Sequence, residues 1–265
     1  MAMEIARAKN GVIVNADAMQ VYRELRILTA RPTVADEALA PHRLYGHVAG
    51  ASDYSVAQWQ RECVGEIEQA HAARQLPIVC GGTGLYFMSL INGLSAVPEI
   101  SPDVRAKWRE FDGDLHAELM LRDSVSAAKL NHADRQRLIR ALEVVESTGL
   151  SLPEWQAKAK AAALLHGFNV VKLHKNLARE EIYARANARF DQMLEQGALA
   201  EVRALPKLHP NQPTMKAIGV PELQAHLRGE ITLEQAKTLA QTATRQYIKR
   251  QLTWARGQMA DWEMC

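Results

Sequence analysis

The sequence predicts an α/β fold in which a helical segment is inserted into a core built on a parallel sheet. Two short apolar runs, 11–14 and 76–80, are typical of buried strands, and an amphipathic helix is expected between them near 55–74. A strand, a helix and a second strand in that order form a β-α-β unit, which makes the two strands parallel. Residues 96–160 show no strand pattern, but one returns at 168–173.

The helix between the two strands is predicted from the spacing of its apolar side chains. From Val56 to Ile67 these residues recur three or four positions apart, which places them on one face of a helix. The second strand runs directly into a glycine turn at 81–84, and a further helix is expected over 85–93.

The inserted region begins where prolines interrupt the pattern. Ser101-Pro-Asp103 is typical of a helix start, with the serine as cap and the proline in the first turn. We therefore predict a core domain and a helical insertion domain. The core comprises residues 1–95 and 166–265, and the insertion comprises residues 96–165.

Two long helices are expected in the last third of the chain. Ile182, Ala186, Arg189 and Met193 follow one face of a helix that Gly197 could end. A second helix is predicted over residues 233–256, where small apolar residues recur at helical spacing.

Composition and the distribution of apolar residues argue against a membrane-spanning protein and a secreted protein. The 265 residues are 48% hydrophobic and 23% charged, which is ordinary for a globular protein, and the net charge is only +2. No run approaches the roughly 18 apolar residues of a membrane span, and the first residues lack the apolar core of a signal peptide. These observations predict a cytoplasmic protein without a membrane partner.

Polar residues gather where the two predicted strands end. Asp17 follows the first strand, and Thr83 lies in the glycine turn after the second. Open α/β sheets bind ligands at the carboxyl ends of their parallel strands, so both side chains are expected at one crevice. A helix cap or a turn residue is the alternative interpretation of Asp17, and a tight turn is the alternative interpretation of the glycines.

Seven segments resemble the tRNA dimethylallyltransferase family, also called tRNA isopentenyltransferases, and they occur in the same order as in that family. They are NADAMQVYR at 15–23, TARPT at 29–33, GGTGLYF at 81–87, residues 134–149, residues 189–194, residues 217–219 and residues 244–254. The resemblance spans nearly the whole chain. It implies a core like that of the P-loop nucleotide hydrolases, with an inserted helical domain that binds tRNA.

One feature of the family is not found in these 265 residues. The family opens with a phosphate-binding loop of the form G-x-x-x-x-G-K-[ST], and the sequence contains no such segment. The amides, lysine and hydroxyl of that loop hold a diphosphate and its metal ion. We therefore expect a truncated chain, without metal ligands of its own, that has little or no activity.

The reaction implied by the resemblance is transfer of a dimethylallyl group from dimethylallyl diphosphate to N6 of adenosine 37 in tRNA. The acceptor amine is a poor nucleophile, and a carboxylate that accepts its proton would solve that problem. Asp17 matches the general base of the family, and Thr83 matches the threonine of its glycine turn. Arg189 matches the arginine that stabilises the diphosphate, although a structural ion pair is the commoner use of such a residue. Mg²⁺ is expected with the diphosphate.

The resemblance and the basic residues also predict a surface for the tRNA anticodon stem-loop. Arginines cluster in the insertion, and Arg245, Lys249 and Arg256 follow one face of the last helix, where a solvated basic face is the alternative. Gln20 could pair with the adenine edge. The predicted tRNA-binding residues are Asp17, Ala18, Met19, Gln20, Thr83, Arg105, Gln136, Arg137, Leu138, Ile139, Arg140, Lys216, Arg245, Lys249, Arg250 and Arg256.

Two other functions fit parts of the sequence. An enzyme that prenylates free adenine nucleotides would need the same core, but it has no use for the arginine-rich insertion. A non-catalytic RNA-binding remnant would explain the absent loop, but it does not explain the presence of Asp17, Thr83 and Arg189. The resemblance implies a monomer.

Overall fold

The computed structural model separates the chain into two compact units. It describes residues 1–95, 97–158, 164–165 and 167–265. Unit 1 comprises Met1–Leu90 and Gly167–Cys265, and unit 2 comprises Ile91–His166. Residues 96 and 166, at the predicted domain boundaries, lie outside the described residues.

Unit 1 is built on a three-stranded parallel sheet in the order β2-β1-β3. Its strands are β1 (Gly11–Asn15), β2 (His42–Arg43) and β3 (Leu76–Cys80). Ile13 of β1 lies opposite His42 on one side and Ile78 on the other. Every residue of β1 is buried, as expected of a central strand covered on both faces. The predicted β-α-β unit with a parallel sheet is therefore confirmed.

The strand predicted at 168–173 is wrong in extent and in place. Only β4 (Leu173–His174) forms, and it pairs with β5 (Glu263–Met264) near the carboxyl end instead of joining the main sheet. The residues before it are too exposed for a core strand, since Val171 is 66% exposed. An apolar run alone did not distinguish this surface segment from a buried strand.

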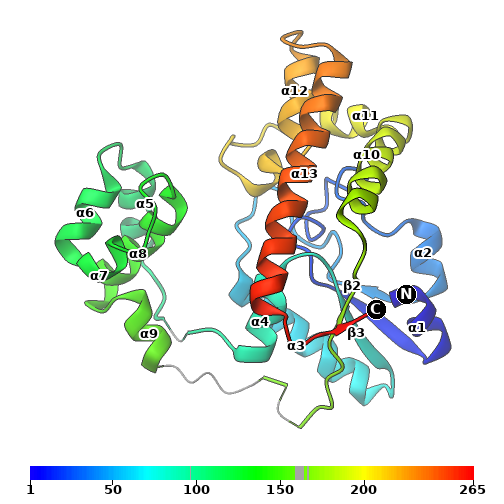
Figure 1. Cartoon of the computed structure of the whole chain (residues 1–265), viewed down its shortest axis with the longest axis horizontal. Coiled ribbons are helices and arrows are strands. Elements are labelled where there is room, and N and C mark those ends of the chain that lie inside the picture. Colours follow the sequence, from blue (N-terminus) through cyan, green and yellow to red (C-terminus); the bar gives the residue numbers. More distant parts are fainter. Residues whose placement is uncertain (96, 159–163, 166) are drawn as a thin grey trace. The chain divides into compact units, whose positions relative to one another are not determined.

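The helices of unit 1 form two groups along the chain (Figure 1). The first group is α1 (Ala2–Ala8), α2 (Val34–Leu39), α3 (Val56–Ala72) and α4 (Gly84–Asn92). The second is α10 (Arg179–Glu195), α11 (Ala198–Arg203), the 3₁₀-helix η1 (Pro213–Lys216), α12 (Val220–Leu227) and α13 (Leu233–Gln258). Figure 1 shows α13, in red, running from α12 down to α4.

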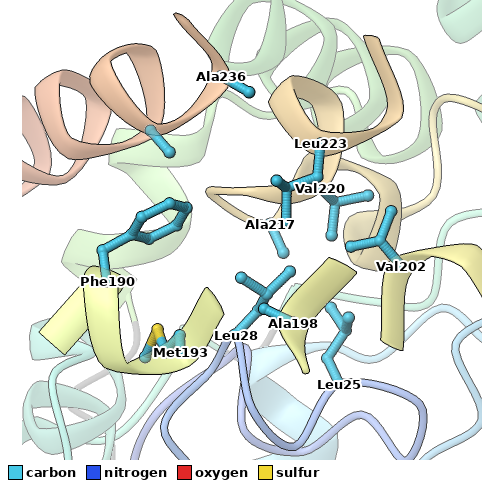
Figure 2. Packing of buried hydrophobic residues seen from close by; sticks show 11 residues of the cluster. Leu25, Leu28, Phe190, Met193, Ala198, Val202, Ala217, Val220, Leu223 and Ala236 are labelled. Carbon is cyan, nitrogen blue, oxygen red and sulfur yellow. The ribbon is translucent and has the colours of Figure 1, made fainter. Parts of the chain in front are cut away.

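The second group of helices shares one apolar core with the loop that follows β1. Leu25 and Leu28 from that loop pack with Phe190 of α10, Val202 of α11 and Leu223 of α12 (Figure 2). Ala236 of α13 belongs to the same cluster. Side chains from four helices and a loop thus bury one another, and this burial is the main force that holds them together. The part of this loop around Leu25 and Leu28 is therefore packed against the helices.

We expect Leu223→Ala to lower the free energy of unfolding by about 2 to 5 kcal/mol, because it empties a buried site. Leu223 is 0% exposed in the core of Figure 2, whereas Leu239 on α13 is 52% exposed. Leu239→Ala is the matched control and should change stability by about 0.5 kcal/mol or less. Denaturant unfolding of the two variants measures the difference. Equal effects would show that this cluster does not stabilise the fold.

Unit 2 is helical throughout its described secondary structure. Its helices are α5 (Pro102–Glu110), α6 (Leu115–Arg122), α7 (Ser124–Ala127), α8 (Arg135–Thr148) and α9 (Leu152–Lys158). The predicted start of α5 is confirmed, because the Ser101 side chain accepts a hydrogen bond from the amide of Val104. Trp108, Leu119 and Leu142 lie at the centre of the unit's own apolar core.

Over the described ranges, no helix is both long enough and apolar enough to cross a bilayer.

Candidate active site

The ends of β1 and β3 are joined by a ladder of hydrogen bonds. The amide of Ala16 donates to the carbonyl of Cys80 (2.8 Å), and the amide of Thr83 donates back to the carbonyl of Ala16 (3.0 Å). The Thr83 hydroxyl accepts from the amide of Ala18 (2.9 Å). The two turns after the strands therefore form one surface, as the sequence predicted, and Thr83 positions the backbone beside Asp17.

Asn15 orders the turn that carries Asp17. Its side-chain amide donates to the carbonyls of Asp17 and Leu44, both at 3.0 Å, and its side-chain oxygen accepts from the amide of Asp17 at 2.8 Å. The indole of Trp59 on α3 donates to the backbone carbonyl of Asn15 (2.7 Å). The buried indole of Trp59 thus supports the strand end directly behind the candidate base.

The glycines of the GGTG turn are required by close approach. A Cβ at Gly81 would overlap the backbone of Ala16, and one at Gly84 would overlap the ring of Trp254 on α13. At Gly82 a Cβ would lie 3.2 Å from Oδ2 of Asp17. The turn therefore needs glycine so that β1, β3 and α13 can meet at one point.

Asp17 is half-buried at this point, and the two oxygens of its carboxylate differ in their hydrogen bonds. Oδ1 accepts from the amides of Met19 (2.8 Å) and Gln20 (3.3 Å). Burial raises the pKa of Asp17 above its ordinary value, while these two hydrogen bonds and the positive charge of Arg189 act in the opposite direction. A carboxylate with a raised pKa and one oxygen free of backbone bonds is suited to accept a proton.

Arg189 lies on α10 between the buried residues Ala186 and Phe190, but it is itself exposed. Its side chain therefore reaches solvent, although Ala186 and Met193 on the same predicted helix face are buried. Among the described residues no carboxylate forms an ion pair with it, and its charge is felt at Asp17. The alternative of a structural ion pair has no support, which leaves the guanidinium free to bind an anion.

Two residues of α13 that the sequence did not single out as catalytic also lie at this site. The Gln251 side chain donates to the carbonyl of Gly82 (2.8 Å). Burial raises the pKa of Tyr247, and the charge of Asp17 adds to that increase. Both residues lie in a segment that matched the family, but no local pattern separated them from neighbouring helix residues.

The adenine-pairing role predicted for Gln20 competes with a structural one. Its side-chain nitrogen donates to the carbonyls of Thr29 (2.7 Å) and Ala30 (3.2 Å), so both of its donors are engaged within the loop. Pairing with adenine would require the amide to leave these carbonyls. Ala18 and Met19, which are consecutive residues within the turn after Asp17, are half-buried.

In unit 2 the predicted tRNA-binding residues fall into two groups. Gln136 and Arg137 are exposed on α8, and Arg105 and Arg140 are half-buried. Leu138, by contrast, is 2% exposed in the core of the unit, with half-buried Ile139 packed against the same cluster. A contact from Leu138 to RNA would have to come from its backbone.

The cations predicted on α13 are not equivalent. Arg245 is committed to packing, because its guanidinium donates to the side chains of Asn187 on α10 (3.0 Å) and Thr242 (2.7 Å). Lys249, Arg250 and Arg256 are exposed, and the first two line an open hollow of about 550 Å³ along α13. Lys216, at the end of η1, is also exposed.

Residues 20–258 match the IPP transferase family. A tRNA dimethylallyltransferase of Bradyrhizobium sp. (strain ORS 278) is 48% identical over 270 residues, which cover 99% of this chain and 87% of that protein. The chain belongs to the IPP transferase family. A tRNA dimethylallyltransferase of Rhodopseudomonas palustris (strain BisB18) is 49% identical, with 99% of this chain and 85% of that protein covered.

Solved structures of IPP transferases agree with this assignment. A tRNA isopentenylpyrophosphate transferase of Bacillus halodurans has a TM-score of 0.68 and 31% identity, with 100% of this chain and 84% of that one covered. A eukaryotic dimethylallyltransferase acting on tRNA has a TM-score of 0.81 and 28% identity, with 96% of this chain and 65% of that one covered. The predicted fold class is confirmed. The predicted truncation and inactivity find no support in these matches.

Proposed function

We propose that this chain transfers a dimethylallyl group from dimethylallyl diphosphate to N6 of adenosine 37, next to the anticodon of tRNA. The observation that carries this proposal is the half-buried carboxylate of Asp17, with its raised pKa, where β1 and the GGTG turn meet. Membership of the IPP transferase family and relatives with this activity support the same reaction. We further propose that the protein acts as a monomer, as the resemblance implies, and that it acts in the cytoplasm, as the composition of the sequence predicts.

The chemistry assigns one task to each side chain. N6 of adenosine attacks C1 of the dimethylallyl group, the bond from C1 to oxygen breaks, and diphosphate leaves with the electron pair. Asp17 accepts the proton that N6 releases, which prevents a positive charge from building up on the amine. Arg189, free of carboxylate partners in the described residues, offsets negative charge on the leaving diphosphate. Thr83 holds the turn that presents Asp17.

Mg²⁺ fits this site only with help from the substrate. In the described part of the chain, no group of three or more His, Cys, Asp or Glu side chains is placed to hold a metal ion. Mg²⁺ commonly keeps several waters and binds substrate phosphates, so most of its ligands here would be diphosphate oxygens and water. It would supply positive charge to the leaving group, and none of the roles given to the side chains above depends on it.

Incubation with labelled dimethylallyl diphosphate and either tRNA or free AMP tests the function. We expect label in tRNA and none in AMP. Label in AMP alone would favour the adenine-nucleotide enzyme. Binding of tRNA without any transfer would favour the RNA-binding protein.

The rate expected of the 265-residue chain depends on how it holds the diphosphate. We propose that transfer by this chain is slow, because no G-x-x-x-x-G-K-[ST] segment lies within it. Single-turnover measurements with excess protein make a slow rate visible. A version extended by such a loop should react faster, and equal rates for the two forms would contradict this proposal.

For tRNA binding we expect Lys249→Ala and Arg256→Ala to weaken affinity and reduce its salt dependence. Each lost phosphate contact should lower the log–log slope by roughly 0.7 to 0.9. Turnover at saturating tRNA should change little, since such contacts bind ground and transition states alike. Lys9→Ala, an exposed lysine at the end of α1, is the control. Normal binding by both variants at every salt concentration would show that this face is only solvated.

A further inference from the structure

A single carboxylate on α11 holds three consecutive backbone amides of the loop that follows β1. Oε1 of Glu201 accepts from the amides of Arg26 (2.7 Å) and Ile27 (2.8 Å), and Oε2 accepts from the amide of Leu28 (3.0 Å). Successive amides that converge on one anion form a strong site, because each bond is assisted by the charge. No residue close to Glu201 in sequence takes part in this contact.

The amides held by Glu201 belong to the loop that begins at Asp17. Further along this loop, the carbonyls of Thr29 and Ala30 receive the side-chain amide of Gln20, three residues after the candidate base. Gln20 also donates its backbone amide to the Asp17 carboxylate. A displacement of the loop would therefore reach Asp17 through only a few hydrogen bonds.

The same loop lies against the helix that carries Arg189. Leu28 lies on the side of Phe190 and Met193 of α10, in the same apolar cluster as Leu25, and Phe190 is adjacent to Arg189 in sequence (Figure 2). Apolar packing of this kind is non-directional and leaves small shifts possible. The three hydrogen bonds to one carboxylate are directional, so they fix the position of the loop more closely than the packing does.

An ordinary surface ion pair does not explain Glu201. It is half-buried, and within the described ranges its hydrogen-bond partners are the three amides, with no cation at ion-pair distance. A charge in such a place is costly unless hydrogen bonds replace its hydration, as the amides do here. The carboxylate and the loop conformation thus depend on each other.

We propose that Glu201 is a positioning residue, which fixes the loop at Arg26–Leu28 so that Asp17 and Arg189 face the same reacting centre. The effect on turnover rests on the function proposed above. Glu201 itself touches neither substrate.

Amide hydrogen exchange tests the contact without any need for activity. The amides of Arg26, Ile27 and Leu28 should exchange slowly in the unmodified chain and faster in Glu201→Gln and Glu201→Ala. Glu222→Ala is the matched control, because Glu222 also accepts a backbone amide, that of Gly219 at 2.9 Å, in the same helical group. It should leave the three loop amides protected. Unchanged exchange in both Glu201 variants would overturn the proposal.

Single-turnover rates and tRNA affinity test the link to the reaction. Glu201→Ala should lower the transfer rate on the order of 10²-fold, the effect of a misplaced catalytic group, with tRNA affinity unchanged. Formate can occupy the space left by the carboxylate, so it should restore part of the rate where chloride at equal ionic strength does not. Glu201→Gln, nearly the same in shape, should also be slow, which guards against a folding defect in the alanine variant.

The outcomes separate this proposal from the proposed function. A rate loss equal to that of Glu222→Ala and insensitive to formate would reduce Glu201 to a general stabilising role and overturn the proposal. If the unmodified chain transferred no prenyl group, the proposed function would fail instead. Exchange at the three amides would still decide whether Glu201 holds the loop.

Discussion

Asp17→Asn is expected to lower the rate of prenyl transfer by about 10² to 10⁴, the usual cost of losing a positioned general base. Asparagine keeps the shape of the side chain and an oxygen that can accept from the amides of Met19 and Gln20, so the turn should remain intact. Affinity for tRNA should be unchanged. The rate in single turnover and the dissociation constant of tRNA measure the two effects, and an unchanged rate would eliminate Asp17 as the base.

The pH dependence of the reaction should report the same carboxylate. Only ionised Asp17 can accept a proton, so the rate at saturating substrates should fall as pH decreases through its pKa. Burial raises that pKa above the ordinary 3.8, so the fall should begin at a higher pH than for a solvated aspartate. Asp17→Asn should lack this limb. A limb that persists in the variant would belong to another group.

As pH rises, the contribution of Asp17 to the free energy of unfolding should decrease, whereas the transfer rate should increase. Between 3.8 and the raised pKa, the folded chain holds a proton on Asp17 that the unfolded chain has lost. The free energy of unfolding contributed by this group therefore decreases as pH rises through that window, and the charged form stays unfavourable above it. At neutral pH Asp17→Asn should melt at the same temperature as the unmodified chain or higher, which separates a slow variant from an unfolded one.

Arg189→Ala should lower turnover by about 10² to 10³, comparable to the loss of one group that stabilises transition-state charge. Affinity for tRNA should be nearly unchanged, because the proposed partner of Arg189 is the diphosphate. Arg185→Ala is the matched control, since Arg185 lies one turn earlier on α10 and forms an ion pair with Glu181 (2.6 Å). Equal rates for the two variants would contradict the role of Arg189.

Local patterns predicted the parts of the fold that local forces decide. Apolar runs located β1 and β3, helical spacing located α3 and α13, and the cap at Ser101 located the start of α5. The strand at 168–173 failed because a run of apolar residues does not reveal which partner, if any, covers it.

The sequence predicted those residues of the candidate site that lie within recognisable local motifs. Asp17 and Thr83 lie at strand ends, so the parallel sheet brings them together. Gln251 contacts the GGTG turn, and Glu201 contacts the loop that follows Asp17, each across more than 160 residues of sequence and each through backbone groups. No side-chain pattern in the sequence marks such contacts, which appear only once the helices have packed.

The position of the transferred group in tRNA tests the proposed function most directly. The chain is incubated with tRNA and labelled dimethylallyl diphosphate, and the nuclease-digested product is mapped by mass spectrometry. We predict one dimethylallyl group on N6 of adenosine 37, formed by the unmodified chain and strongly reduced with Asp17→Asn. Transfer to another nucleotide, or equal transfer by the two proteins, would contradict the function and the role given to Asp17.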